Sequence, residues 1–146
     1  MARRIALLVF VAISMVVGPA MEAGASPSTT PCTIKITAMH FRPRRIAPGA
    51  SSTVTARARN CTSTTQDASI TWLGQFTGPT PGVPAGCPVI DPVAQPISLL
   101  PHGRAVASMT YEVFLSCSAT ELAVTARVSD RNGNVLTRRT AELVIS

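Results

Sequence analysis

The chain is poor in lysine, histidine and aromatic residues. Its 146 residues include one lysine, Lys35, two histidines and 4% aromatic residues, whereas arginine supplies nearly all of the 13 basic side chains. Few aromatic side chains are available to stack on nucleic-acid bases, and we therefore expect no nucleic-acid partner. The core of such a chain must be built from Val, Ile, Leu and Ala.

The two histidines form no catalytic pattern with their neighbours. His40 precedes Phe41 and His102 lies in the turn Pro101-His102-Gly103, and neither has an acid and a nucleophile at a recognisable spacing. The motif Gly-x-Ser-x-Gly is absent, and the carboxylates after residue 25 are scattered singly. We therefore expect a protein that is not an enzyme and that holds no cofactor.

Long apolar runs are also missing, apart from one near the start. Residues 5–17 are apolar, follow two arginines and precede Gly18-Pro19. This run of about 13 residues is too short to span a bilayer and is typical of a signal peptide. The small residues Ala23 and Ala25 predict cleavage after Ala25, with Ala20 and Ala23 as alternatives. Residues 1–25 are thus a predicted signal peptide, after which we expect no transmembrane segment.

Removal of that peptide leaves 121 residues with a net charge of about +5 and all four cysteines. This length fits one domain. Four cysteines in an exported chain predict two disulfides and a secreted, extracellular location. A zinc site is the alternative, but cysteine spacings of 29, 26 and 30 residues contain no Cys-x-x-Cys pair.

The pattern after the signal peptide is that of β-strands. Residues 26–32 predict a flexible lead-in, and from residue 33 onward apolar and polar side chains alternate without helical periodicity. Residues 74–92 are rich in Gly and Pro, which predicts a long irregular connection, and Asn132-Gly133 predicts a hairpin. We predict an all-β, antiparallel sandwich over residues 33–146 with about seven strands, near residues 33–37, 54–59, 69–73, 97–100, 104–115, 122–129 and 135–145.

The turn and strand pattern resembles a known family. It is similar to bacterial extracellular immunoglobulin-like domains of the cell-adhesion-related type and, more loosely, to fibronectin type III domains. The resemblance covers nearly all of residues 33–146 and implies an immunoglobulin-like sandwich. It is carried by Ile34-x-Ile36, Phe41-x-Pro43, Pro48-Gly49 before Val54-x-Ala56, and Val128-x-Asp130-x-Asn132-Gly133-x-Val135.

The topology implied by this resemblance predicts how the cysteines pair. Cys32 begins the first strand and Cys61 ends the second, so they meet at one end of the sandwich. Cys87 and Cys117 lie in connections at the opposite end. We therefore predict the disulfides Cys32–Cys61 and Cys87–Cys117.

Two short motifs have alternative interpretations. Asp130, Asn132 and Asn134 alternate like the opening of a calcium loop, but residue 141 is Ala where an EF-hand has its glutamate, which favours a hairpin turn. Asn60-Cys61-Thr62 is formally a glycosylation sequon, and the alternative is a strand end beside a disulfide.

Arginines suggest one candidate binding surface. Three of them, Arg42, Arg44 and Arg45, follow Phe41 in a turn, and Arg57 and Arg59 share one face of a strand. We predict that these five form a basic patch for an anionic cell-surface polymer or an unknown protein partner, the alternative being an ordinary solvated surface.

Three loops at one end, residues 62–67, 101–103 and 130–134, are a further candidate surface. Loops on a stiff scaffold commonly carry binding. The expected function is therefore a secreted binding or structural module of the bacterial cell envelope or exterior.

A second resemblance is local. Cys87-Pro88-Val89-Ile90-Asp91-Pro92-Val93 is similar to the reactive loop of bacterial subtilisin inhibitors, in which a disulfide holds a Cys-Pro pair beside the scissile bond. It implies an alternative function, a secreted serine-protease inhibitor. Val89 would then enter the protease's specificity pocket, and Val89-Ile90 would be the target bond.

Overall fold

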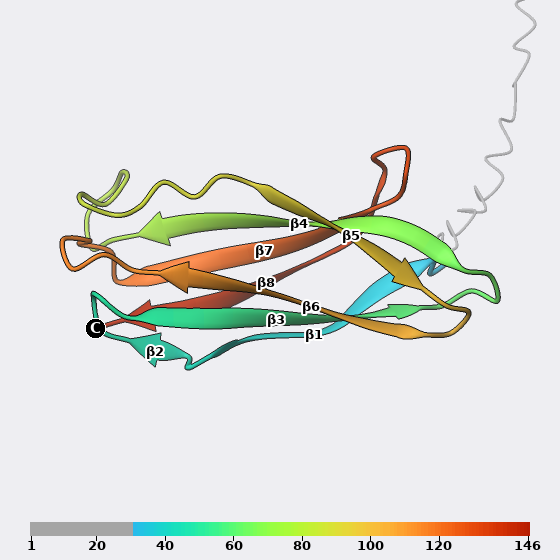
Figure 1. Cartoon of the computed structure of the whole chain (residues 1–146). Helices are drawn as coiled ribbons and strands as arrows, with labels where there is room; N and C mark the ends of the chain where they lie inside the picture. The colour runs from blue at the N-terminus through green and yellow to red at the C-terminus, as the bar shows by residue number, and fades with distance from the viewer. Residues whose placement is uncertain (1–30) are drawn as a thin grey trace, which may run out of the picture. The chain divides into compact units, whose positions relative to one another are not determined.

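The computed structural model describes residues 31–146, and all of the regular structure in this part is β-strand (Figure 1). The predicted signal peptide, residues 1–25, and most of the predicted lead-in lie outside the described residues. Over residues 31–146 no helix is long and apolar enough to cross a membrane. The strands are β1 (Ile34–Arg42), β2 (Arg45–Ile46), β3 (Ser51–Asn60), β4 (Gln66–Thr77), β5 (Val93–Leu99), β6 (Arg104–Glu112), β7 (Glu121–Ser129) and β8 (Val135–Ile145).

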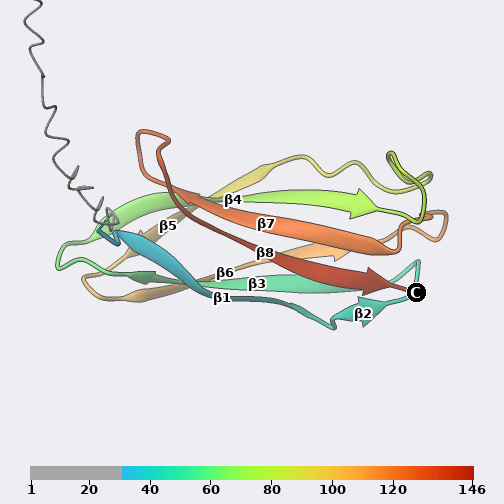
Figure 2. The ribbon, with the colours of Figure 1, turned by 180° about the vertical axis from the view of Figure 1, so that it is seen from behind.

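These strands form the predicted immunoglobulin-like sandwich of two sheets. One sheet has the order β1-β3-β6 and the other β2-β8-β7-β4-β5. Every pairing is antiparallel except that of the two-residue strand β2 with β8. Seen from behind, β1 and β8 lie side by side along one open side of the sandwich (Figure 2).

The alternation in the sequence places the core between the sheets. In β3 the residues Val54, Ala56 and Ala58 are buried, while the residues between them face outward. Most other core residues are likewise aliphatic, and Trp72 and Phe41 are the largest fully buried side chains. An aliphatic core of this kind is what a sequence with few rings predicts.

Both predicted disulfides are present, one at each end of the sandwich. Cys32–Cys61 joins the start of β1 to the residue after β3, and Cys87–Cys117 joins the β4–β5 and β6–β7 connections. We call these the Cys61 end and the Cys117 end. Disulfides of this kind indicate an oxidising environment.

The chain passes from one sheet to the other shortly after β1. Residues 43 and 44 carry it from β1 to β2, where Arg45 pairs with Val144 and Ile46 with Ile145. The β1–β3 register also shifts between Ile36 and Ala38, which is a β-bulge. Neither feature has a signal in the alternation, and the bulge shapes the surface described next.

Candidate binding surfaces

Three cations form a row across the outer face of the three-stranded sheet. Lys35 in β1 is opposite Arg59 in β3, and Arg59 is opposite Arg104 in β6. All three side chains are exposed. Successive side chains in a strand point to opposite faces, and the residues beside these three face the inner side of the sheet. Neighbouring strands lie about 4.8 Å apart, so the row places three positive charges within roughly 10 Å.

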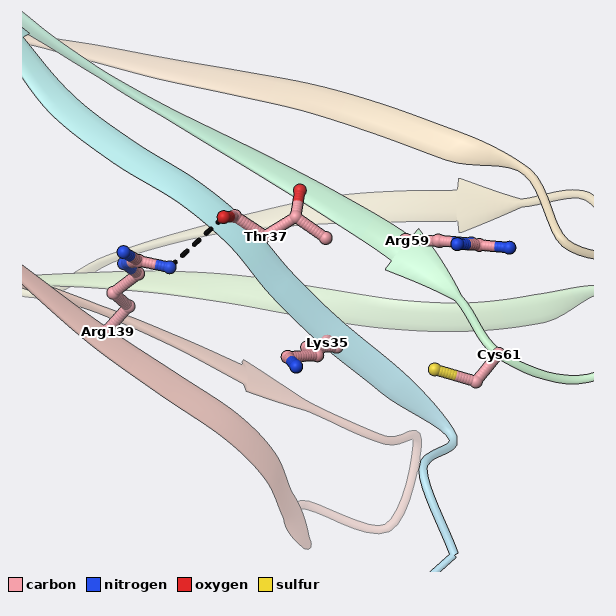
Figure 3. A pocket seen from close by; sticks show the side chains of 5 residues that line it. All are labelled: Lys35, Thr37, Arg59, Cys61 and Arg139. Atoms are coloured by element: carbon pink, nitrogen blue, oxygen red, sulfur yellow. Dashed lines mark hydrogen bonds between the residues drawn. The ribbon is translucent and has the colours of Figure 1, made fainter.

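Two further arginines extend this row. Arg57 lies two residues before Arg59 on the same face of β3. Arg139 reaches over from β8, and its Nη1 donates a hydrogen bond to the carbonyl oxygen of Thr37, 3.1 Å away (Figure 3). That carbonyl is at the bulge, where Thr37 has no direct partner in β3. We refer to these five residues as the basic surface: Lys35, Arg57, Arg59, Arg104 and Arg139.

Two adjoining hollows open on the basic surface. One, of about 530 Å³, is lined by Lys35, Thr37, Arg59, Cys61 and Arg139, the residues drawn in Figure 3. The other, of about 370 Å³, shares Thr37 and Arg59 and extends to Arg57 and Arg104. The two hollows adjoin at these shared residues, and cations line both of them.

The basic surface has little negative charge to balance it. Glu112 is the one acidic residue in β1, β3 or β6, and it ends β6 eight residues from Arg104, at roughly 3.3 Å per residue about 26 Å away. Within residues 31–146 the one salt bridge joins Arg131 to Asp67, and both belong to the opposite sheet and its hairpin. Like charges directly opposite each other in a sheet are destabilising. Neighbouring cations in the row are about 5 Å apart, which is less than the Debye length of about 8 Å in physiological salt, so salt screens their repulsion only partly.

The structure brings together only part of the patch predicted from sequence. Arg57 and Arg59 lie in the basic surface at the Cys61 end. Arg42 is opposite Thr53, four residues along β3 from Arg57 and hence about 13 Å away. Arg44 and Arg45 follow at the Cys117 end, where Arg44 shares a small hollow with Glu142. The five predicted arginines therefore form two separate groups.

Sequence reasoning missed Lys35, Arg104 and Arg139 as parts of this surface. Lys35 and Arg104 each alternate with buried or half-buried residues, so the sequence pattern alone indicates that their side chains point outward. Their alignment with Arg59 can be known only from the register of the strands. The position of Arg139 depends on the packing of β8 beside β1, which no local sequence pattern predicts.

The three predicted loops do gather at the Cys61 end (Figure 1). The backbone N–H of His102 donates to the carbonyl of Thr62 at 3.0 Å, and Arg131 forms its salt bridge with Asp67. A hydrogen bond from the Ser98 side chain, together with Arg131, lowers the pKa of Asp67. These contacts hold the loops against one another.

The Asp130 carboxylate holds the β7–β8 hairpin turn. Its Oδ1 accepts backbone N–H groups from Asn132 (2.9 Å) and Asn134 (2.8 Å), and its Oδ2 accepts the side-chain amide of Asn134 (2.9 Å). Hydrogen bonds from Asn134, first from its side chain, lower the pKa of Asp130. The alternation of Asp130, Asn132 and Asn134 thus serves a turn, as the hairpin interpretation predicts.

The segment proposed as an inhibitor loop lies at the Cys117 end. Val89 is 90% exposed, two residues after the disulfide-bonded Cys87. Ile90 instead packs against Gly74 in β4, where an added Cβ would lie 2.8 Å from Ile90 Cδ1. Both residues line a hollow of about 520 Å³. Val89 therefore projects outward from a segment that the disulfide and Ile90 hold in place.

Comparison with known proteins gives the fold and no family. No protein-family model matches this chain, and no curated protein matches it. Part of an alkylpurine DNA glycosylase, AlkC, from Pseudomonas fluorescens, solved bound to DNA containing an abasic-site analogue, is similar to 80% of this chain, with 13% identity and a TM-score of 0.58. Part of a cycloisomaltooligosaccharide glucanotransferase from Paenibacillus sp., complexed with cycloisomaltoheptaose, is similar to 77% of it, with 13% identity and a TM-score of 0.55. This chain spans 31% and 14% of those two proteins. At such identity the similarity shows the sandwich alone.

Proposed function

We propose that this protein is a secreted, non-enzymatic module that binds an anionic polymer of the cell exterior through its basic surface. The observation that supports this is the row Lys35–Arg59–Arg104, in which three strands place cations opposite one another while the one carboxylate of those strands, Glu112, lies at the far end of β6. An anionic ligand is attracted to the row, and its negative charge also offsets the repulsion among the three cations.

The geometry favours a polymer with closely repeated charges. Cations spaced about 5 Å across the strands and about 7 Å along them form a strip rather than a single anion pocket. Arginine binds carboxylate, phosphate and sulfate groups in a bidentate manner, which suits such a strip. The basic surface carries no aromatic side chain, so the proposed recognition is through charged groups rather than through sugar rings or bases.

Fluorescein-labelled heparin is a suitable probe polyanion, with binding followed by fluorescence anisotropy at two salt concentrations. We expect affinity to fall as salt rises, as it does wherever binding releases counterions. At about 1 kcal/mol per basic side chain, the double substitution Arg57→Ala/Arg59→Ala is expected to weaken binding about thirtyfold.

A matched control lies on the opposite sheet. Arg127 in β7 and Arg138 in β8 are exposed and directly opposite each other, so Arg127→Ala/Arg138→Ala removes the same net charge. We expect this control to change affinity much less. An equal loss from both double variants means that net charge alone governs binding, and salt-insensitive binding removes the electrostatic basis altogether; either result contradicts the proposal.

The exposure of Val89 favours a second candidate function, inhibition of a serine protease. A protruding apolar side chain on a segment held by Cys87–Cys117 loses little entropy when it docks. The test is to titrate the oxidised protein against subtilisin-like and chymotrypsin-like proteases. Stoichiometric inhibition that Val89→Asp abolishes and Val83→Asp retains supports this function, because Val83 is 94% exposed in the same connection. Rapid cleavage without inhibition excludes it.

A further inference from the structure

Four strands lie at the edges of the two sheets, and three of them are protected against pairing with another chain. An unprotected edge presents free N–H and C=O groups, which proteins block with short strands, prolines, bulges or covering segments. Strand β2 has two residues, and β5 has Pro96 near its middle. Strand β1 has the bulge, and Arg139 of β8 bonds its Thr37 carbonyl.

The fourth edge, β6, has none of these devices. It runs nine residues without proline, lysine or bulge, and its register with β3 is unbroken from Arg104 to Glu112. On its other side no strand of residues 31–146 pairs with it. A straight edge of this length is a template for one more strand.

The outward residues of β6 are complementary to themselves when the strand is reversed. They are Arg104, Val106, Ser108, Thr110 and Glu112, with a cation at one end and a carboxylate at the other. If two copies of β6 pair antiparallel about Ser108, Arg104 is opposite the partner's Glu112, and Val106 is opposite the partner's Thr110. Opposite charges directly across a strand pair are stabilising.

The other face of β6 is complementary in size in the same register. Ala105 is then opposite the partner's Tyr111, and Ala107 is opposite the partner's Met109, so each small side chain faces a large one. A shift by two residues in either direction loses both charge pairs, so the charges select the register centred on Ser108. We therefore infer that this protein forms a twofold-symmetric dimer through β6, centred on Ser108, which joins the two three-stranded sheets into one of six strands. This inference does not depend on the proposed function: in the dimer Arg104 pairs with the partner's Glu112, and Lys35, Arg57, Arg59 and Arg139 are then the cations left for an anionic ligand.

Sedimentation velocity of the exported protein with both disulfides formed tests the dimer. Arg104→Glu places a carboxylate opposite the partner's Glu112, and Glu112→Arg places a guanidinium opposite the partner's Arg104. Each dimer has two such like-charged pairs, so we expect each single variant to dimerise at least about tenfold more weakly than the wild type. Both positions are exposed, and circular dichroism checks that each variant keeps the wild-type fold.

An equimolar mixture of the two variants is the decisive experiment. In the mixed dimer the introduced glutamate of one variant faces the introduced arginine of the other, and the unchanged Glu112 faces the unchanged Arg104. We therefore expect the mixture to recover wild-type dimerisation, whereas neither variant does so alone. A wild-type protein that is monomeric up to about 200 µM overturns the inference. The β6 edge would then be a candidate site for pairing with a strand of a different protein. Dimerisation that neither substitution weakens, or that mixing does not restore, overturns it as well.

Discussion

The side-chain nitrogen of Asn60 lies 3.0 Å from the carbonyl oxygen of Leu100 and donates a hydrogen bond to it. The same nitrogen donates to the carbonyls of Thr64 (2.7 Å) and Leu99 (3.2 Å), and the side-chain oxygen accepts from the backbone and hydroxyl of Thr62. One fully buried amide thus ties the end of β3 to the β3–β4 loop and to the β5–β6 turn.

Replacing Asn60 is expected to destabilise the fold strongly. Asn60→Ala leaves several buried backbone groups without partners, so we expect the free energy of unfolding to fall by about 2–3 kcal/mol. Asn60→Asp presents a carboxylate to three carbonyl oxygens and is expected to be at least as destabilising. Guanidinium unfolding, followed by circular dichroism, measures both.

The burial of Asn60 also determines whether the sequon Asn60-Cys61-Thr62 can be glycosylated in the folded protein. Because both ends of the amide are bonded, the folded protein does not present Asn60 to a glycosylating enzyme. Treating the folded protein with such an enzyme is expected to give no modification, and a modified folded protein would contradict this placement.

Two glycines with positive φ are expected to respond differently to alanine. Gly133 in the hairpin turn has φ +84° and open space around it, so Gly133→Ala is expected to cost about 1 kcal/mol of backbone strain. At Gly86, φ is +69° and an added Cβ would overlap the carbonyl oxygen of Ser116. We therefore expect Gly86→Ala to cost more than about 3 kcal/mol. Equal unfolding midpoints for the two variants would argue against this packing at the Cys117 end.

Tyr111 makes stability depend on alkaline pH. Burial raises its pKa to about 12 from an ordinary value of 10.0, because the phenolate is poorly solvated beside Phe41. The folded state therefore holds the proton more tightly than the unfolded state. Its contribution to stability is complete below pH 10 and is lost as pH rises towards 12.

Absorbance at 295 nm measures this ionisation, since Tyr111 is the single tyrosine of the chain. We expect a midpoint near 12 for the folded protein and near 10 in guanidinium. Tyr111→Phe is expected to flatten the dependence of stability on pH above 10. A folded-state midpoint at the ordinary value would contradict the raised pKa that burial of the Tyr111 side chain gives.

The two disulfides are expected to contribute similar stability but to protect different segments. Each closes a loop of about 30 residues, and the loss of either pair, by Cys→Ala substitution at both positions, is expected to cost about 3–4 kcal/mol. Loss of Cys87–Cys117 should also expose residues 78–92 to proteolytic cleavage. Limited proteolysis with mass spectrometry locates the cut, and the variant lacking Cys32–Cys61 is the control, expected to resist cleavage in that segment.

The sequence predicted the strands well because burial in a sandwich follows alternation. Val54, Ala56 and Ala58 define β3 unaided, and residues 122–129 match β7 closely. Element ends were less predictable: the irregular connection was expected from Gly74, but β4 continues to Thr77, paired with β7 through its last residue. Pairing of this kind overrides a local glycine.

Features that depend on two distant segments could not be predicted. Strand β2 has only two residues, and they pair with Val144 and Ile145 at the far end of the chain. The basic surface likewise depends on strand register, which aligns Lys35 with Arg59 and Arg104 and separates Arg42 from them. Sequence neighbours such as Arg42 and Arg45 were grouped because they are close along the chain, not in space.

The position of Lys35 allows the basic surface to be labelled selectively. Lys35 is the single lysine of the chain, so its ε-amine is the one side-chain amine available to acylating reagents. Acetylation there removes one charge from the surface and leaves every arginine unchanged. The rate at which Lys35 is labelled therefore reports whether that surface is covered, and a fluorophore attached through it monitors occupancy without an engineered tag.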